Sequence, residues 1–338
     1  MRGENRMFAQ LKKFVMPAGV SGDEGEISAV LAAEIAPYVD DVYSDAMGNL
    51  IAFKKGNGEN PKKLMFAAHM DEIGFMVSFI EEKGYLRVSK MGGINYNAAA
   101  FSEVVFKNGT RGVLVPEART AAKDFRPDVF YVDIGAKNKK DAERRVKIGD
   151  TCRVAPTLVR LAGSRVAGRP IDDRIGCLML FEAAKAAKNF ENDTYFVFTV
   201  QEEVGVRGAK TSAFAIRPDY AVAVDIGGSG DVINSAPFAV NLSEGIAVKL
   251  KDGMVICHQK MIDLMKMIAD QKKVPYQLEI LEGGGTDTCM LQQAAGGCIA
   301  GALSVPTRYG HSAVEVIDMN DVSGGVKILA GLCEKKLD

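Results

Sequence analysis

The sequence has no tryptophan and only 7% aromatic residues, and its 338 residues include only three histidines and six cysteines. The cysteines are widely scattered and form no Cys-x-x-Cys pair, which excludes a thiolate clamp for a structural metal and a dithiol redox motif. Scattered thiols of this kind are typical of the reducing cytosol. We therefore expect a cytoplasmic protein with reduced cysteines.

Long apolar runs are also missing. The closest stretch, from Cys289 to Pro306, is interrupted by two glutamines and three glycines, so it does not fit a membrane span. The first segment, MRGENRMFAQLKKF, lacks the apolar core of a signal peptide. We expect neither a membrane partner nor secretion.

The sequence also lacks a large excess of positive or negative residues. Lys plus Arg total 42 and Asp plus Glu total 43, for a net charge of -1. This balance provides no basic surface for a phosphate backbone, so nucleic acid is not an expected partner. The remaining composition is that of a soluble globular protein, with 47% hydrophobic and 25% charged residues. At about 100 to 200 residues per domain, the length predicts about two domains.

Hydrophobic periodicity predicts the first elements. Ser21 and Glu24 stand three residues apart like a capping box, and apolar residues then recur at helical spacing, which predicts a helix over about 22–36. The segment VYSDAMGNLIAFKKGNG predicts two strands. The apolar run KKLMFAAH is too short for a helix and predicts a strand that ends at His69.

Between about 74 and 165 the helical periodicity almost disappears. Short segments such as FMVSFI, YLRVSK, EVVFK, RGVLV and VFYVDIG are separated by turn signals, which predicts a β-rich domain. The Asn108-Gly109 pair predicts a hairpin with a type I′ turn. One short helix is expected around 139–146.

After Asp172 the pattern changes to alternating strands and helices. Strands are predicted over 194–200, 220–226 and 298–304, and helices over 175–188, over QKMIDLMKMIADQ and near 320–335. Alternation of this kind predicts the α/β class, with a mostly parallel sheet covered by helices.

Side chains able to bind a metal follow several of these strands. His69 ends one predicted strand, Glu202 and Glu203 follow a second, and Asp225 ends a third. Open α/β sheets place their ligands at the carboxyl ends of the strands, so these side chains are expected at one edge.

Two further residues can reach the same edge. His311 follows the strand CIAGALS by a short loop, and Asp172 opens the helix after the β-rich segment. Two imidazoles with several carboxylates suit zinc, cobalt or manganese better than calcium or magnesium, which favour oxygen-only shells. We therefore predict a transition-metal site.

Each of these residues also has an ordinary structural explanation. His69 alone fits a buried hydrogen-bonding residue, Glu202-Glu203 fits a solvated acidic pair, and Asp172 fits a helix cap. Asp225 ends an apolar run, where a carboxylate is costly unless it is paired. His258 lies just before a predicted helix and is interpreted as a cap or surface residue.

Several short motifs occur in one order along nearly the whole chain: GVSGDE (19–24), DAMGNL (45–50), HMDEIGF (69–75), IDDRIG (171–176), QEEVGVRGA (201–209), VDIG (224–227), GGGTD (283–287) and RYGHSAVEV (308–316). Each motif alone is weak evidence for a protein family, whereas the whole set in this order is specific. As a set they resemble the cytosolic co-catalytic metallo-aminopeptidases of metallopeptidase family forty-two. That family includes glutamyl aminopeptidase and the tetrahedral dodecameric aminopeptidases.

The resemblance implies a ligand set for two divalent metal ions. Asp172 matches the bridging carboxylate, His69 and Asp225 complete one site, and Glu203 and His311 complete the other. Zinc is the expected ion, and cobalt and manganese are the alternatives.

The resemblance also implies two catalytic residues outside the ligand set. Glu202 matches the free general base, and Asp71 matches the carboxylate that orients a histidine ligand. A His-x-Asp spacing on an extended segment turns both side chains to the same side, which suits that role. In IDDR the first Asp is the better match for the bridge, so Asp173 is the alternative.

The implied activity is removal of the N-terminal residue from short peptides with a free N-terminus. A metal-bridging hydroxide would be the nucleophile, and Glu202 would take its proton and pass it to the leaving amine. The implied fold is zinc-peptidase-like, with a catalytic domain of residues 1–73 and 166–338 and an inserted, barrel-like dimerisation domain of residues 74–165. Because His69 precedes the insert and Asp172 follows it, both parts must form one site. The family's insert pairs subunits, so a homo-oligomer from dimer to dodecamer is expected.

Two other functions stay open. A glycoside hydrolase also needs a pair of carboxylates, but the lack of tryptophan counts against sugar binding. A catalytically dead assembly protein would not need all five candidate ligands and Glu202. After Asp225 the chain contains IGGSGDVINSAPF and NLSEGIAVKLKDG, where the family commonly has a more polar stretch and a Gly-x-Gly-Pro segment. The preferred N-terminal residue of the substrate therefore stays open.

Overall fold

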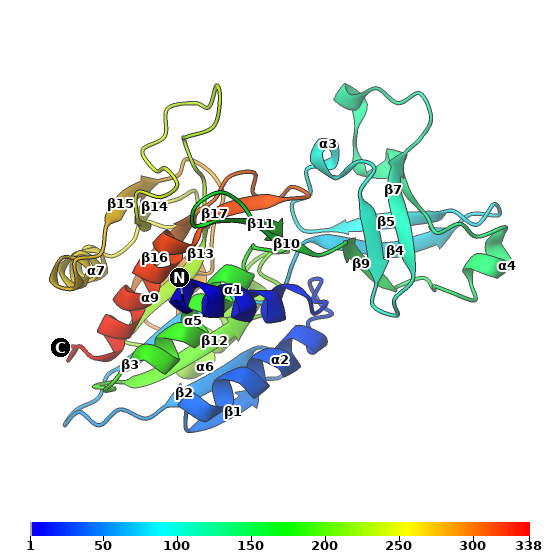
Figure 1. Cartoon of the computed structure of the whole chain (residues 1–338). Helices are drawn as coiled ribbons and strands as arrows, with labels where there is room; N and C mark the ends of the chain where they lie inside the picture. Colours follow the sequence, from blue (N-terminus) through cyan, green and yellow to red (C-terminus); the bar gives the residue numbers. More distant parts are fainter. Residues whose placement is uncertain (1) are drawn as a thin grey trace.

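A computed structural model describes residues 2–338 of the chain, with a large α/β body and a smaller β-barrel beside it (Figure 1). The α/β body is built on an eight-stranded sheet in the order β1-β2-β12-β3-β13-β16-β14-β15. Four of its seven neighbouring strand pairs are parallel, and these include the three central pairs around β3 and β13. The strands are β1 (Asp41–Ser44), β2 (Leu50–Lys54), β3 (Lys63–His69), β12 (Asp193–Thr199), β13 (Tyr220–Gly227), β14 (Ile246–Lys251), β15 (Tyr276–Ile280) and β16 (Ile299–Pro306).

Helices cover both faces of this sheet because the central strands are apolar on both sides. In β3, Leu64 and Phe66 face the larger core while Met65 and Ala67 face a smaller one, as the two-residue period of a strand requires. The larger core contains α1 (Arg2–Val15), α2 (Gly25–Ile35), α5 (Arg174–Ala186), α7 (Gln259–Lys272) and α9 (Met319–Cys333). The smaller core contains α6 (Arg207–Ile216) and α8 (Thr288–Gln292). The α/β prediction with a mostly parallel, helix-covered sheet is confirmed.

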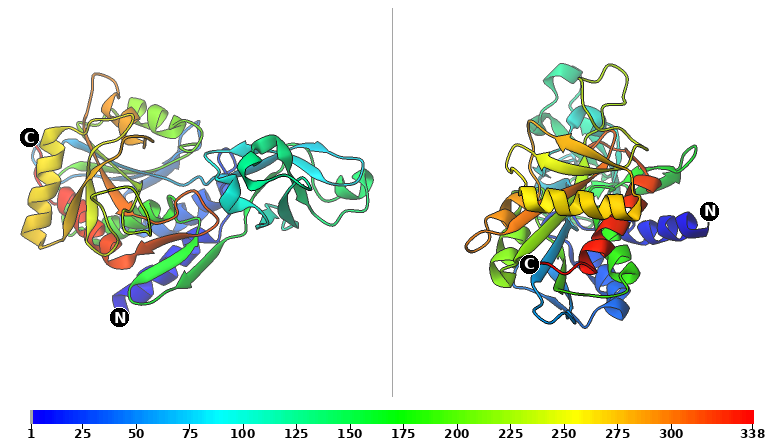
Figure 2. Two further views of the ribbon diagram at one scale, coloured as in Figure 1. Left: turned by 90° about the horizontal axis from the view of Figure 1, so that it is seen from above. Right: turned by 90° about the vertical axis from the view of Figure 1, so that its left-hand side faces the viewer.

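The second body is a closed barrel with strand order β4-β5-β8-β7-β6-β9. It has its own apolar core, which includes Phe75, Leu114 and Phe130, and it projects to one side of the sheet in both Figure 1 and Figure 2. The barrel strands are β4 (Gly74–Ile80), β5 (Leu86–Met91), β6 (Glu103–Phe106), β7 (Arg111–Pro116), β8 (Phe130–Asp133) and β9 (Thr151–Val154), with short helices α3 (Tyr96–Ala99) and α4 (Lys139–Ala142). A separate three-stranded sheet then joins β10 (Thr157–Arg160), β11 (Arg165–Arg169) and β17 (Glu315–Asp318).

Several local predictions need correction. The capping box is wrong, because Ser21 donates its hydroxyl to Asp71 and Glu24 makes no side-chain cap bond to α2. The hairpin at Asn108-Gly109 is confirmed, but only Gly109 has a positive φ, of 84°, so the turn is not type I′. A type I′ turn needs positive φ at both central residues, whereas one left-handed glycine fits a turn that ends in a bulge. The helix α1 was not predicted.

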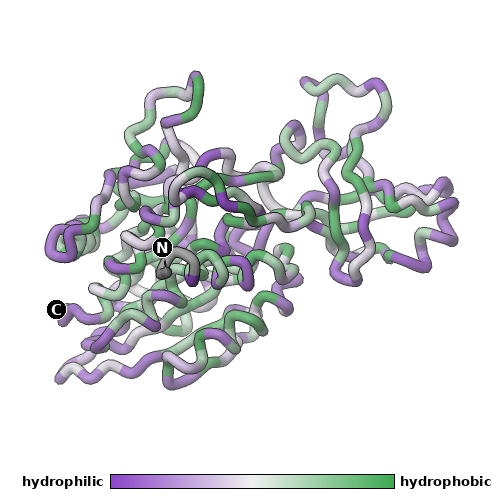
Figure 3. The backbone as a smooth tube through the Cα atoms, viewed as in Figure 1, coloured by the Kyte–Doolittle hydropathy of each residue, from purple (hydrophilic) through white to green (hydrophobic). Residues whose placement is uncertain are grey.

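The distribution of hydropathy follows this architecture. Hydrophobic segments run along the central strands and the helices packed on them, while the outer loops are largely hydrophilic (Figure 3). Within residues 2–338, no helix combines the length and apolar character needed to cross a membrane.

Candidate metal centre

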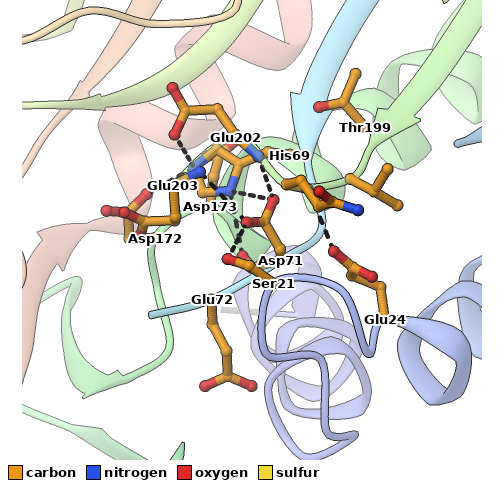
Figure 4. Close-up of polar contacts among 12 residues, drawn as sticks. Ser21, Glu24, His69, Asp71, Glu72, Asp172, Asp173, Thr199, Glu202 and Glu203 are labelled. Carbon is orange, nitrogen blue, oxygen red and sulfur yellow. Dashed lines mark hydrogen bonds and ion pairs between the residues drawn. The ribbon is translucent and has the colours of Figure 1, made fainter. Parts of the chain in front are cut away.

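The candidate site lies where three parallel strands end. His69 is the last residue of β3, and it pairs in register with Thr199 at the end of β12. Glu202 and Glu203 follow β12 directly, and Asp225 lies near the end of β13. The close-up in Figure 4 shows His69, Glu202 and Glu203 close to one another, although they come from different elements. This is the edge at which α/β sheets bind their ligands.

Asp172 lies between the two histidines. Its Oδ1 is 3.1 Å from Nε2 of His69, and its Oδ2 is 3.1 Å from Nε2 of His311. The carboxylate is buried at the start of the segment that leads into α5. Each of its two oxygens therefore faces a different imidazole.

The remaining candidate ligands lie beside one histidine each. Asp225 Oδ1 is 3.9 Å from Nε2 of His69, and Glu203 Oε2 is 3.8 Å from Nε2 of His311. Glu202 Oε2 also approaches His69, at 4.0 Å. His69, Asp172 and Glu203 each offer one ligand atom, and these three atoms lie within 4.8 Å of one another. This spacing suits a shared metal ion.

Asp173 also lies at this site. Together with His69 and Asp225 it forms a second group whose ligand atoms are within 4.8 Å of one another. Its Oδ1 accepts a hydrogen bond of 2.9 Å from the amide of Gly176 and so caps α5. Its Oδ2 is buried and has no hydrogen-bond partner among the residues that the structure describes. The helix cap that sequence reasoning offered as an alternative for Asp172 thus belongs to Asp173.

Asp71 connects His69 to the acidic pair. Its Oδ1 is 3.5 Å from Nδ1 of His69 and accepts a hydrogen bond of 2.9 Å from the amide of Glu202. Its Oδ2 accepts from the hydroxyl of Ser21 at 2.6 Å and from the amide of Glu203 at 3.3 Å. A carboxylate on the far nitrogen of a histidine fixes the orientation of the ring.

His311 contacts the barrel as well as the acidic cluster. Its Nδ1 lies 2.8 Å from the carbonyl oxygen of Gly93, which follows the barrel strand β5. Its side chain remains 44% exposed, whereas that of His69 is 2% exposed. The open side of the candidate site is therefore the side of His311.

The electrostatics of the cluster favour a bound cation. Burial raises the pKa of Glu203 to about 8 and that of Asp225 to about 7, and the charge of Asp172 adds to both shifts. Burial also raises the pKa of Glu202 well above its usual range. Among the side chains of residues 6–338, no lysine or arginine forms an ion pair with any of the carboxylates just named. Buried carboxylates are stable as anions only when a positive charge compensates them, as a divalent ion would.

The histidines and Asp172 stabilise one another's charged forms. The hydrogen bond from His311 to Asp172 raises the pKa of His311 to about 10. Burial opposes ionisation of Asp172, but its hydrogen bonds to His311 and His69 outweigh this effect and hold its pKa below the usual range. Asp172 is thus held in its anionic form, as a bridging ligand needs to be.

Two further buried carboxylates were missed in the sequence. Glu315 accepts from the amides of Ile171 and Asp172 at 2.7 and 3.1 Å, and so holds the backbone that carries the central carboxylate. Asp287 accepts from the hydroxyl of Thr199 at 2.5 Å. In the sequence, a buried role of Glu315 is indicated only by its position as a single acidic residue between two valines, in the segment VEV. His258, as expected, caps a helix, because its Nδ1 accepts from the amide of Lys260.

The chain is similar to a known protein family and to several known proteins. A family profile described as M42 glutamyl aminopeptidase matches residues 48–328. A putative aminopeptidase of Acetivibrio thermocellus is 46% identical over 328 residues, which cover 96% of this chain and 98% of that protein.

Two solved structures extend the comparison. An aminopeptidase of the archaeon Desulfurococcus kamchatkensis superimposes with a TM-score of 0.94 at 34% identity, over 98% of this chain and 96% of that one. The Pyrococcus horikoshii TET1 peptidase, described as able to assemble into a tetrahedron or a large octahedral shell, has a TM-score of 0.84 at 33% identity, over 97% of this chain and 99% of that one.

Proposed function

The chain belongs to the M42 glutamyl aminopeptidase family and is an aminopeptidase, and from this premise we propose that it is a two-metal enzyme that removes N-terminal residues from short peptides. The observation that carries the proposal is the position of Asp172, with one oxygen 3.1 Å from each of two histidines. A single carboxylate placed in this way suits a bridge between two ions.

The proposed ligands divide into two groups around that bridge. His69 and Asp225 would hold one divalent ion, and Glu203 and His311 would hold the other, with Asp172 shared. Two imidazoles and three carboxylates suit zinc, with cobalt or manganese as alternatives. When bound, the two ions would polarise the scissile carbonyl and lower the pKa of the attacking water.

Glu202 is the proposed general base. It follows β12 directly before the proposed ligand Glu203, and its Oε2 lies 4.0 Å from Nε2 of His69. Its Oε2 would accept the proton of the attacking water and then donate it to the leaving amine. Asp71 supports this role, because the same carboxylate contacts His69 and accepts from the amide of Glu202.

The proposed substrate is a peptide with a free N-terminus. Buried acidic side chains line the site, and an ionised carboxylate that is not a metal ligand would attract the ammonium group of such a substrate. All six cysteines are buried and unpaired, in agreement with a protein of the reducing cytosol.

The experiment is a peptide assay with chelator-stripped enzyme, reconstituted with zinc, cobalt or manganese. Aminoacyl-anilides and free peptides should be cleaved one N-terminal residue at a time, and acetylated copies of the same peptides should be resistant. His311→Ala should abolish the activity, while His258→Ala, a histidine that caps α7, should leave it unchanged. Equal rates on free and acetylated peptides, or cleavage at internal bonds, would contradict the aminopeptidase mechanism.

The geometry of the site favours neither of the other functions considered from the sequence. A dead assembly protein would have no reason to keep this buried acidic cluster, because uncompensated buried carboxylates destabilise a fold. A glycoside hydrolase needs two carboxyl groups with distinct roles at a sugar site, whereas here the carboxylates surround two imidazoles. The same panel of anilides separates these functions from a peptidase.

A further inference from the structure

The segment that carries the acidic pair is held by side chains rather than by a neighbouring strand. Four consecutive backbone amides, those of residues 200–203, each donate to a side-chain oxygen. The acceptors are Asn49 at 3.0 Å, Glu24 at 3.2 Å and Asp71, whose two oxygens accept at 2.9 and 3.3 Å. No two of these three residues are neighbours in the sequence.

The local backbone explains why this support is needed. Gln201 has a φ of 56°, in the left-handed region, so the chain turns sharply at the end of β12. A turned segment cannot continue the hydrogen-bond ladder of the sheet, and a buried amide without a partner costs free energy. The side chains of Glu24 and Asn49 supply the missing acceptors at the two residues before Glu202.

Asn49 secures the beginning of the segment. It is fully buried, and its Nδ2 donates to Asp45 at 2.7 Å and to the carbonyl of Gly208 at 3.1 Å. A β-carbon at Gly208 would lie 2.2 Å from its Oδ1, so this glycine is needed for the close approach. Asn49 thus ties the amide of Val200 to the first turn of α6.

Glu24 secures the residue next to Glu202. Its Oε1 accepts from the amide of Gly22 at 2.6 Å and from the amide of Gln201 at 3.2 Å, and only 7% of the residue is exposed. Although it precedes α2, its side chain makes no bond to that helix. The carboxylate is therefore directed at the segment of the acidic pair, as Figure 4 shows.

We propose that Glu24 is a positioning residue for Glu202: it fixes the backbone at Gln201 and thereby sets where the carboxylate of Glu202 lies. This inference rests on the proposed role of Glu202 as general base. A base must lie within hydrogen-bond reach of the proton it takes, about 2.6 to 3.2 Å. Loss of the bond to Gln201 would let the left-handed residue relax and move the base away from that reach.

The test compares Glu24→Ala and Glu24→Gln in the metal-loaded enzyme. Glu24→Ala should lower kcat by about 10- to 100-fold with little change in KM, because a displacement of about 1 Å can cost a hundredfold in rate. Glu24→Gln should stay close to the wild-type kcat, because its amide oxygen still accepts from both backbone amides. Glu26→Ala, at an exposed position in the first turn of α2, is the matched control and should leave kcat unchanged.

A double-mutant cycle with Glu202→Gln separates positioning from a general loss of structure. If Glu24 acts through Glu202, adding Glu24→Ala to Glu202→Gln should lower kcat no further. Metal content should equal that of the wild type in all these variants. An undiminished kcat in Glu24→Ala, a Glu24→Gln variant as slow as Glu24→Ala, or additive losses in the double variant would each overturn the proposal. Full activity of Glu202→Gln would instead refute the base itself, so the two failures are distinguishable.

Discussion

Glu202 and Glu203 are adjacent in the sequence, yet they face different partners. Glu203 lies 3.8 Å from Nε2 of His311, and Glu202 lies 4.0 Å from Nε2 of His69. The left-handed Gln201 and the two oxygens of Asp71 fix the backbone so that the two side chains diverge. Adjacent carboxylates can in this way have separate roles, one as ligand and one as base.

Exchanging each glutamate for glutamine tests this division of roles. Glu202→Gln should keep both metal ions and lose about 100- to 10,000-fold in kcat, the usual contribution of general acid-base catalysis. Glu203→Gln should lose metal, because an amide oxygen is a poorer ligand than a carboxylate. Elemental analysis and steady-state kinetics on the two variants measure both effects, and the opposite pattern would exchange the two assignments.

The buried acidic groups also predict how pH affects the stability of metal-stripped protein. Burial raises the pKa of Glu203 to about 8, and those of Asp225 and Glu315 to about 7, from ordinary values of 4.5 or 3.8. Between pH 5 and 8 the folded state thus binds more protons than the unfolded state, so stability falls as pH rises. The histidines, whose pKa values are also raised, act in the same direction above pH 6.5.

Thermal unfolding checks this prediction. The melting temperature of stripped protein should fall by more than about 3 °C between pH 6 and pH 8, which corresponds to roughly 2 kcal/mol for a chain of this size. Saturation with zinc should reduce the decline, because the ions compensate the ionised carboxylates. A melting temperature that rises over this interval in stripped protein would show that the acidic cluster is compensated by other charges.

The central residues of the site were predictable because strand ends mark them. His69, Glu202, Glu203 and Asp225 each follow or end an apolar run, and the structure brings them together at one edge. Contacts between segments that are distant in the sequence leave no pattern in the local sequence, so they could not be predicted. The bonds from Glu24 to Gln201 and from Glu315 to the amide of Asp172 depend on tertiary packing that spacing does not reveal.

At the scale of elements, a buried ionic group joins the barrel to the catalytic sheet. Glu72 Oε1 lies 2.9 Å from Nη1 of Arg153 in the barrel strand β9 and 3.2 Å from Nη2 of Arg174 at the start of α5. Arg153 also donates to the carbonyls of Val15 and Pro17, at 3.3 and 3.0 Å, just where α1 ends. One guanidinium therefore connects the barrel, α1 and the residue next to Asp71.

Arg153→Met should lower the free energy of unfolding by about 3 to 5 kcal/mol, because it removes one of the two cations beside the buried Glu72 and the donor to the carbonyl of Val15. The matched control is Arg111→Met, whose partner Glu103 lies on the exposed surface of the same barrel. An exposed pair contributes about 1 kcal/mol or less. Urea unfolding at one fixed protein concentration measures both, and equal effects of the two variants would be inconsistent with this account of the junction.

Element predictions succeeded where hydrophobic periodicity was strong. The helices α5, α7 and α9 and the strands β3, β12 and β13 all lie close to their predicted ranges. The helix α1 was not predicted, although Leu11, Phe14 and Val15 stand at helical spacing and pack in the main core. The capping box failed because Ser21 and Glu24 bond to distant residues, which a local motif cannot reveal.

At the scale of the whole molecule, the barrel is a folded unit beside the α/β body, and its function has to be explained. Gly93, which follows the barrel strand β5, contacts His311, so the barrel borders the site, but the rest of the barrel projects away from the α/β body (Figure 2). We propose that this surface pairs subunits and that the pairs assemble further, as the shells described for the Pyrococcus horikoshii relative suggest. The proposed insert, residues 74–165, and its dimerisation role stay predictions.

Light scattering tests the assembly. The native enzyme should have a mass of at least two chains and about twelve in the full assembly, and replacing the barrel strands β4 to β9 with a short linker should reduce it. Mass is the useful readout, because loss of the contact from Gly93 to His311 should lower activity as well. A stable, fully active monomer at micromolar concentration would refute the assembly role.

The number of metal ions per chain tests the central claim most directly. Chelator-stripped enzyme is titrated with zinc while bound metal and hydrolysis of an aminoacyl-anilide are measured together. The proposed site predicts saturation at about two ions per chain, full activity only near that point, and loss of tight binding in Asp172→Ala. Activity that persists without metal, or saturation at one ion with full activity, would contradict the two-metal mechanism.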